Sequence, residues 1–84
     1  MTRFWSEGLP ITVTCDRLAT PEAFVWSGHR HRVTQVVERW RVEDGWWQRR
    51  IWREYFTLTT DTGLLVEIYH DVRAATWRLQ RLYD

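Results

Sequence analysis

Apolar and polar residues alternate with a period of two along most of this chain, and short turn signals interrupt the alternation. In "ITVTCDRL", Ile11, Val13 and Cys15 alternate with polar residues, and "AFVW" places Phe24 and Trp26 on one face. Successive side chains of a strand point to opposite faces, so this period indicates strands that are buried on one side. Short strands joined by tight turns favour an antiparallel meander.

The run "HRVTQVVERWRV" is too long to keep one phase of this alternation. Val33 and Val37 fall on one face, whereas Val36, Trp40 and Val42 fall on the other. A β-bulge adds one residue to a strand and reverses the faces beyond it. We therefore expect a bulge near Val36 and Val37, and a bent strand of the kind that a curled sheet requires.

Turn signals divide the second half of the chain. "EDG" at 43–45 predicts a turn, and residues 46–50 are expected to form a loop or a single helical turn. The β-rich stretch "YFTLTT" at 55–60 then predicts a strand, which we expect to start at about residue 51. "DTG" at 61–63 predicts a tight hairpin connection between that strand and "LLVEIYHD". "VRAA" then turns into a last strand, "TWRLQRLYD".

These elements predict an all-β fold, a single small antiparallel meander of five or six strands that forms a curled sheet or a partly open barrel. Residues 1–9 are interpreted as an N-terminal arm and residues 10–84 as one β domain. A chain of 84 residues is too short to support two cores. The expected inner face contains Phe24, Trp26, Phe56, Leu58, Ile68 and Trp77.

Tryptophan is abundant for so small a chain, with seven residues in 84. Each buried indole removes a large apolar area from water, so a few of them can supply much of a small core. We expect at least three or four to be buried among Trp26, Trp40, Trp46, Trp47, Trp52 and Trp77.

The segment "RWRVEDGWWQRRIWREY", residues 39–55, combines tryptophan with arginine more densely than the rest of the chain. Neighbouring indoles on an extended backbone point to opposite sides, so one of Trp46 and Trp47 is expected to face solvent. Exposed Trp and Arg are the residues enriched at binding hot spots. The candidate binding residues are Arg41, Trp46, Trp47, Arg49, Arg50 and Arg53.

The sequence offers little support for catalysis. His29, His31, His70 and Asp71 are the candidate metal ligands, but they lack a recognisable zinc spacing. No Gly-rich phosphate loop or nucleophile elbow is present. We therefore expect no enzymatic activity, no metal and no cofactor.

Cellular context is inferred from what the sequence lacks. Cys15 has no second cysteine to pair with, which fits a reducing compartment. The N-terminus lacks the cationic stretch followed by an apolar run that is typical of a signal peptide. No apolar run approaches the about 18 residues of a membrane span. The expected location is the cytoplasm, without contact with a membrane.

Three roles for the Arg/Trp-rich segment stay open: docking of a protein partner, binding of single-stranded DNA, and self-burial in a structural homo-oligomer. The formal net charge of +1 gives little general attraction to a polyanion. Because phosphate contacts supply much of the affinity for nucleic acid, protein docking is favoured.

Three segments carry a resemblance to known proteins: "PEAFVWSGHRHRV", "EYFTLTTDTGLLVEIYHD" and "TWRLQRLYD". Together they resemble a small bacterial family of free-standing proteins of unknown function. There is a weaker similarity to the C-terminal region of ImuB, the inactive Y-family polymerase relative of mutagenic repair, although the polymerase-like portion is absent here. The resemblance implies an accessory role in DNA repair or translesion synthesis, through contact with protein or DNA. The residues that carry it are Trp40, Trp46, Trp47, Arg49, Arg50, Arg53, Tyr55, Phe56, Gly63, Trp77, Tyr83 and Asp84.

Overall fold

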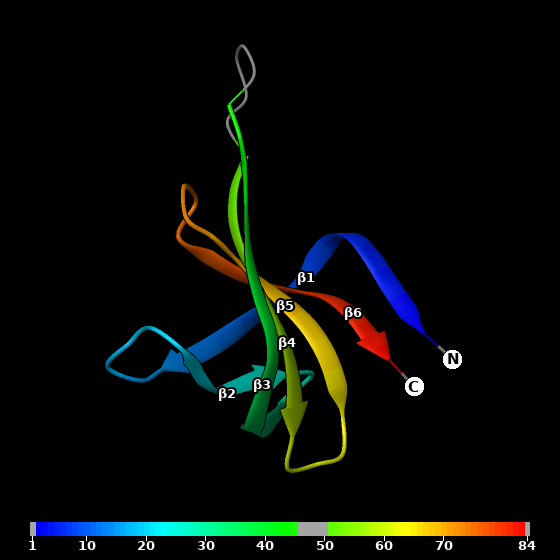
Figure 1. The fold of residues 1–84 in the computed structure, drawn as a ribbon. Coiled ribbons are helices and arrows are strands. Elements are labelled where there is room, and N and C mark those ends of the chain that lie inside the picture. Colours follow the sequence, from blue (N-terminus) through cyan, green and yellow to red (C-terminus); the bar gives the residue numbers. More distant parts are fainter. Residues whose placement is uncertain (1, 46–50, 84) are drawn as a thin grey trace.

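The computed structural model describes residues 2–45 and 51–83, which form six antiparallel strands in sequence order. Each strand pairs with the next, and the first pairs with the last, so the meander closes into a ring (Figure 1). The predicted all-β meander is therefore confirmed. The strands are β1 (Arg3–Cys15), β2 (Pro21–Trp26), β3 (His29–Asp44), β4 (Ile51–Thr60), β5 (Leu65–Asp71) and β6 (Thr76–Tyr83).

The ring is uneven because two long strands, β1 and β3, are shared between a larger and a smaller sheet. Residues 29–32 of β3 pair with β2, whereas residues 33–44 pair with β4. The register of β3 shifts between Val33 and Gln35 and again between Val36 and Glu38. The predicted bulge near Val36 is therefore confirmed. Bulges bend a strand, which lets β3 leave one sheet and continue in the other.

The N-terminal residues contribute to the ring instead of standing apart from it. Residues 1–9 were expected to form an arm, but β1 begins at Arg3, and its first half pairs with β6. Arg3 lies opposite Leu82, and Leu9 lies opposite Leu79. These cross-strand partners are distant in sequence, so local periodicity gives no sign of the pairing.

A kink in β1 at Gly8 brings its backbone close to β5 and β6. Gly8 has a φ of +76°, and a Cβ built there would lie 2.7 Å from the Arg78 Cβ. The Tyr69 hydroxyl donates a hydrogen bond to the Glu7 carbonyl (3.0 Å), and the Arg78 guanidinium donates one to the Gly8 carbonyl (3.3 Å). A side chain at residue 8 would not fit this approach.

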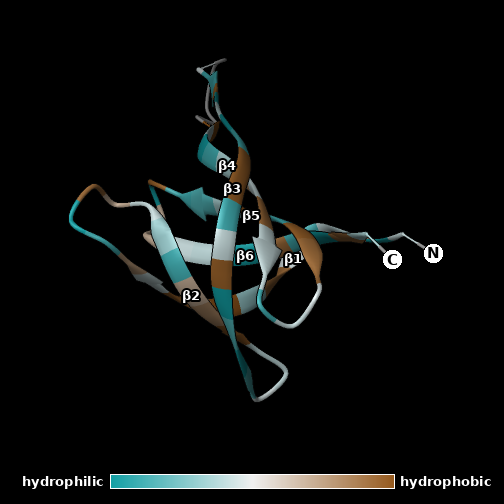
Figure 2. Cartoon of the chain, turned by 60° about the horizontal axis from the view of Figure 1, so that its bottom comes forward, coloured by the Kyte–Doolittle hydropathy of each residue, from teal (hydrophilic) through white to brown (hydrophobic). Residues whose placement is uncertain are grey.

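The core lies inside the ring and is built from aliphatic side chains and phenylalanine: Phe24, Phe56, Leu58, Val66, Ile68, Leu79 and Leu82. Four members of the predicted inner face are fully buried, and the other two, Trp26 and Trp77, pack against the core while half-buried. Figure 2 shows hydrophobic and hydrophilic bands along β3, and of its valines Val33 and Val36 pack against the core.

The expectation of three or four buried tryptophans is wrong. All five described tryptophans are half-buried, namely Trp5, Trp26, Trp40, Trp52 and Trp77. Phenylalanine and aliphatic side chains fill the narrow interior, while Trp5, Trp26 and Trp77 pack around its margin.

The predicted turn at 43–45 also differs from the structure. β3 continues through Glu43, which lies opposite Trp52, to Asp44, which lies opposite Ile51. The ladder between β3 and β4 therefore extends further than the turn signal suggested, and residues 46–50 lie outside the described part of the chain.

Candidate functional site

The outer part of the β3–β4 hairpin stands away from the ring and holds the described members of the predicted site (Figure 1). Arg41 lies opposite Glu54, and Arg53 lies opposite Val42. The two arginines therefore occupy opposite faces of the hairpin, because neighbouring strand residues alternate. The predicted site residues Trp46, Trp47, Arg49 and Arg50 lie outside the described residues.

The inner face of the hairpin, which continues the core-facing side of β4, carries a shared ion pair. Arg39 and Arg41 each place an Nη2 atom near Oε1 of Glu54, at 3.3 and 2.9 Å. Hydrogen bonding to Arg41, opposed by burial and reinforced by Arg39, holds the pKa of Glu54 below its usual range. The Arg39 guanidinium also lies over the Phe56 ring, 5.1 Å from its centroid, and so covers that end of the core.

The opposite, outer face of the hairpin carries a row of three aromatic rings that crosses β3, β4 and β5. The rings of Trp40 and Tyr55 stack with centroids 5.2 Å apart and planes 6° apart. Tyr55 packs in turn against Tyr69, at 5.3 Å. The Arg53 guanidinium lies 4.6 Å from the Tyr69 ring centroid and donates a hydrogen bond to the Tyr55 hydroxyl (3.3 Å). We call Trp40, Tyr55, Tyr69 and Arg53 the aromatic row.

Sequence reasoning missed Tyr55 and Tyr69 as neighbours of the predicted site. A usable signal was present, because residues placed symmetrically about the turn at 61–63 lie opposite each other in a hairpin. Tyr55 and Tyr69 are equally distant from Thr62, and the observed register pairs them. Tyr69 is almost fully buried although it lies on the outer face, and this burial raises the pKa of its hydroxyl.

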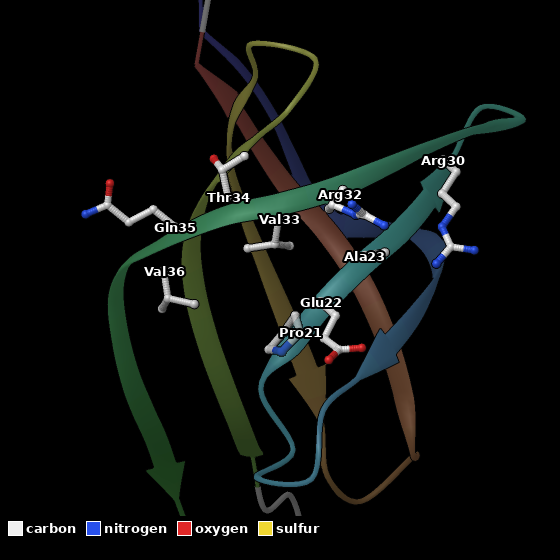
Figure 3. A pocket seen from close by; sticks show the side chains of 9 residues that line it. All are labelled: Pro21, Glu22, Ala23, Arg30, Arg32, Val33, Thr34, Gln35 and Val36. Carbon is white, nitrogen blue, oxygen red and sulfur yellow. The ribbon is translucent and has the colours of Figure 1, made fainter.

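A groove of about 460 Å³ opens where β3 leaves β2. In Figure 3 the side chains of Val33 and Val36 lie along this gap, and Pro21 lies across it at the start of β2. The lining residues are Pro21, Glu22, Ala23, Arg30, Arg32, Val33, Thr34, Gln35 and Val36. Beyond this groove, the described residues of β3 are no longer paired with β2.

Beyond the groove, β3 is an edge strand. Within the described residues, its residues 33–44 pair with β4 on one side and with no strand on the other. The residues on the outer face of this edge are Glu38, Trp40, Val42 and Asp44, and those on the inner face are Arg39, Arg41 and Glu43. An unpaired edge presents backbone donors and acceptors to any chain that can align with it.

The histidines considered as metal ligands have other surroundings. The His31 ring nitrogen Nδ1 lies 2.7 Å from the Thr62 hydroxyl, and its ring packs on Phe24. His70 stacks on Trp77 with centroids 4.5 Å apart. Across residues 2–45 and 51–83, no group of three or more His, Cys, Asp or Glu residues is placed to hold a metal ion.

Cys15 ends β1 and is half-buried. Burial, together with the charges of Asp16 and Glu22, raises the pKa of its thiol. A raised pKa lowers the thiolate fraction at neutral pH, which is the opposite of what an activated nucleophile requires.

No helix in the described part of the chain is long and apolar enough to cross a membrane. Comparisons of the chain with family models, with curated proteins and with solved structures found no match.

Proposed function

We propose that this chain is a non-catalytic interaction module that docks a protein partner on the outer face of the β3–β4 hairpin. The aromatic row supports the proposal most directly. Trp40 lies at the open edge of the sheet, and its stacking partner Tyr55 is itself packed against Tyr69 and hydrogen-bonded by Arg53. Aromatic and arginine side chains that are ordered before binding lose little conformational entropy when a partner covers them.

The charge around this surface favours protein over nucleic acid. The described outer part of the hairpin, residues 38–44 and 51–54, carries Arg39, Arg41 and Arg53, but it also carries four carboxylates. Two of the arginines already share Glu54. Binding of nucleic acid depends strongly on cations that neutralise phosphates, and among the described residues of this part of the hairpin the carboxylates outnumber the arginines. The four carboxylates are Glu38, Glu43, Asp44 and Glu54.

Binding of single-stranded DNA is the second candidate, and the same aromatic row is the observation that favours it. Bases stack on exposed aromatic rings with about 1 to 3 kcal/mol each, and an adjacent arginine adds attraction to the backbone. Trp40 and Arg53 offer such a combination. The resemblance to ImuB directs the search for either partner to assemblies of bacterial DNA repair or translesion synthesis.

The test is affinity capture of partners from a bacterial extract, with and without nuclease treatment, using the wild-type chain and Trp40→Ala. We expect nuclease-resistant capture that the substitution reduces strongly, because it removes the ring at the open edge of the row. Leu18→Ala is the matched control, since it removes an apolar side chain that is 80% exposed in the β1–β2 turn.

Two results would count against docking. Capture that disappears with nuclease would favour DNA binding in its place. Equal capture by wild type and Trp40→Ala, with unchanged melting curves, would remove the hairpin as the docking surface. Titration of a fluorescent single-stranded oligonucleotide at several salt concentrations then measures the DNA alternative directly, because phosphate contacts give a steep salt dependence.

A further inference from the structure

Along the open edge of β3, basic and acidic side chains are arranged so that they would face opposite charges on a second copy running antiparallel. Beyond the bulge, the ladder from Glu38 to Asp44 is regular, so its inner and outer faces alternate without interruption. On the inner face Arg41 is followed by Glu43, and on the outer face Val42 lies between Trp40 and Asp44. Val42 is 38% exposed.

We propose that two copies of this chain pair antiparallel along this edge, with Val42 at the two-fold axis. In this register, Arg41 of each copy lies opposite Glu43 of the other, which gives two symmetric ion pairs on the inner face. Val42 lies opposite its own counterpart, and Trp40 lies opposite Asp44. Opposite charges and apolar side chains in directly facing positions stabilise antiparallel pairs.

Neighbouring registers are less favourable because each sets like charges opposite each other. Pairing centred on Arg41 sets Arg39 opposite Glu43, but it also places the Arg41 guanidinium against its own copy. The same register places Glu38 against Asp44 twice. Pairing centred on Trp40 places Arg39 against Arg41, and pairing centred on Glu43 places two carboxylates together. Like charges directly opposite are destabilising, so charge selects the register centred on Val42.

The shape of the molecule permits this pairing. Val42 pairs with Arg53 in the outer part of the hairpin. This part stands away from the ring (Figure 1). Two hairpins paired antiparallel there would extend their rings in opposite directions. The contact is short, because the regular edge spans only residues 38–44 in the described chain. Interfaces well below about 1,000 Å² are usually weak, so the dimer is expected to form and dissociate with concentration.

This inference goes beyond the proposed docking role, because it concerns pairing along the backbone edge of β3, and its charge-reversal variants change Arg41 and Glu43 on the inner face, opposite the aromatic row. Pairing would place two aromatic rows in one continuous sheet. The two proposals can therefore fail separately. A chain that stays monomeric yet captures a partner through Trp40 would overturn only the dimer.

The first experiment is sedimentation equilibrium over a wide concentration range, with charge reversals at the facing pair. Glu43→Arg should weaken dimerisation by about 10- to 100-fold, because it replaces two symmetric attractions with repulsions. Arg41→Glu should weaken it at least as much, and it also removes the ion pair with Glu54 within the chain. The double variant restores opposite charges between the copies but not the pair with Glu54, so its dissociation constant should recover by at least about tenfold from that of Arg41→Glu. Arg3→Glu, an exposed arginine on β1, is the control and should leave dimerisation unchanged.

The second experiment tests the register itself by disulfide cross-linking in a Cys15→Ala background. Val42→Cys places two thiols opposite each other at the axis, within the Cα separation that a disulfide spans. It should cross-link under mild oxidation much faster than Val37→Cys, whose parent side chain is 53% exposed on the same strand.

Several outcomes would overturn the proposal. They are a monomer at every concentration, a dimer that the charge reversals do not affect, failure of the double variant to restore pairing, and equal cross-linking at residues 37 and 42. Melting curves of each variant show whether the monomer is folded. A folded double variant that stays monomeric would exclude the register centred on Val42.

Discussion

Gly8→Ala should destabilise the fold more than any other glycine-to-alanine change among the described residues. The φ of +76° at Gly8 costs an L-residue about 1 to 2 kcal/mol. The new Cβ would also lie 2.7 Å from the Arg78 Cβ and 3.2 Å from the Tyr69 ring, in a segment anchored by two hydrogen bonds. Relieving such a contact costs about 1 to 3 kcal/mol. The total loss of unfolding free energy is about 2 to 5 kcal/mol.

Thermal unfolding followed by circular dichroism measures this loss. At about 4 to 8 °C per kcal/mol for a domain of this size, the melting temperature should fall by about 8 to 40 °C. Gly28→Ala and Gly63→Ala are matched controls, because both glycines have positive φ but a Cβ added at either would meet no atom within 4 Å. Their melting temperatures should fall by about 5 to 15 °C. Equal losses in all three variants would refute the argument from close approach.

Three further variants test individual contacts by thermal melts. Tyr69→Phe removes the hydrogen bond to the Glu7 carbonyl and should lower the melting temperature by about 3 to 10 °C; no change would mean that the bond adds nothing to stability. Glu54→Gln should lower the melting temperature by about 2 to 6 °C at pH 7 and by less in acid, because the depressed pKa of Glu54 gives stability that is lost as pH falls. A decrease in melting temperature that does not depend on pH would exclude this charge effect. Glu67→Gln should raise the melting temperature at pH 7, because burial raises the pKa of Glu67 and its ionised form costs stability. At about pH 4 the substitution should have little effect. A lower melting temperature at pH 7 would show that the ion pair with Arg81 outweighs burial.

Local signals in the sequence were sufficient for the meander and for part of its register. The period-two runs and the turn at 61–63 predicted strands that the structure contains, and that turn determines which residues of β4 and β5 are opposite each other. The change of phase in the run of valines predicted the bulge near Val36. These features depend on residues close in sequence, so periodicity and turn chemistry could reveal them.

Closure of the ring and the two faces of the site could not be predicted in this way. The pairing of Arg3 with Leu82 is a long-range contact without a local pattern. Arg41 and Arg53 lie on opposite faces because Val42, and not Arg41, lies opposite Arg53. That register depends on the length of the connection between β3 and β4, and a shift of one residue would have placed the two arginines on the same face.

The pairing of β1 with β6 also determines how the molecule can be handled. The start of β1 and the end of β6 lie side by side, away from the projecting hairpin (Figure 1). A tether, fluorophore or fused domain attached to either end would therefore leave the hairpin facing solution. Immobilisation through one end, or a short linker that joins the two, offers a way to study binding by the hairpin without obstructing it.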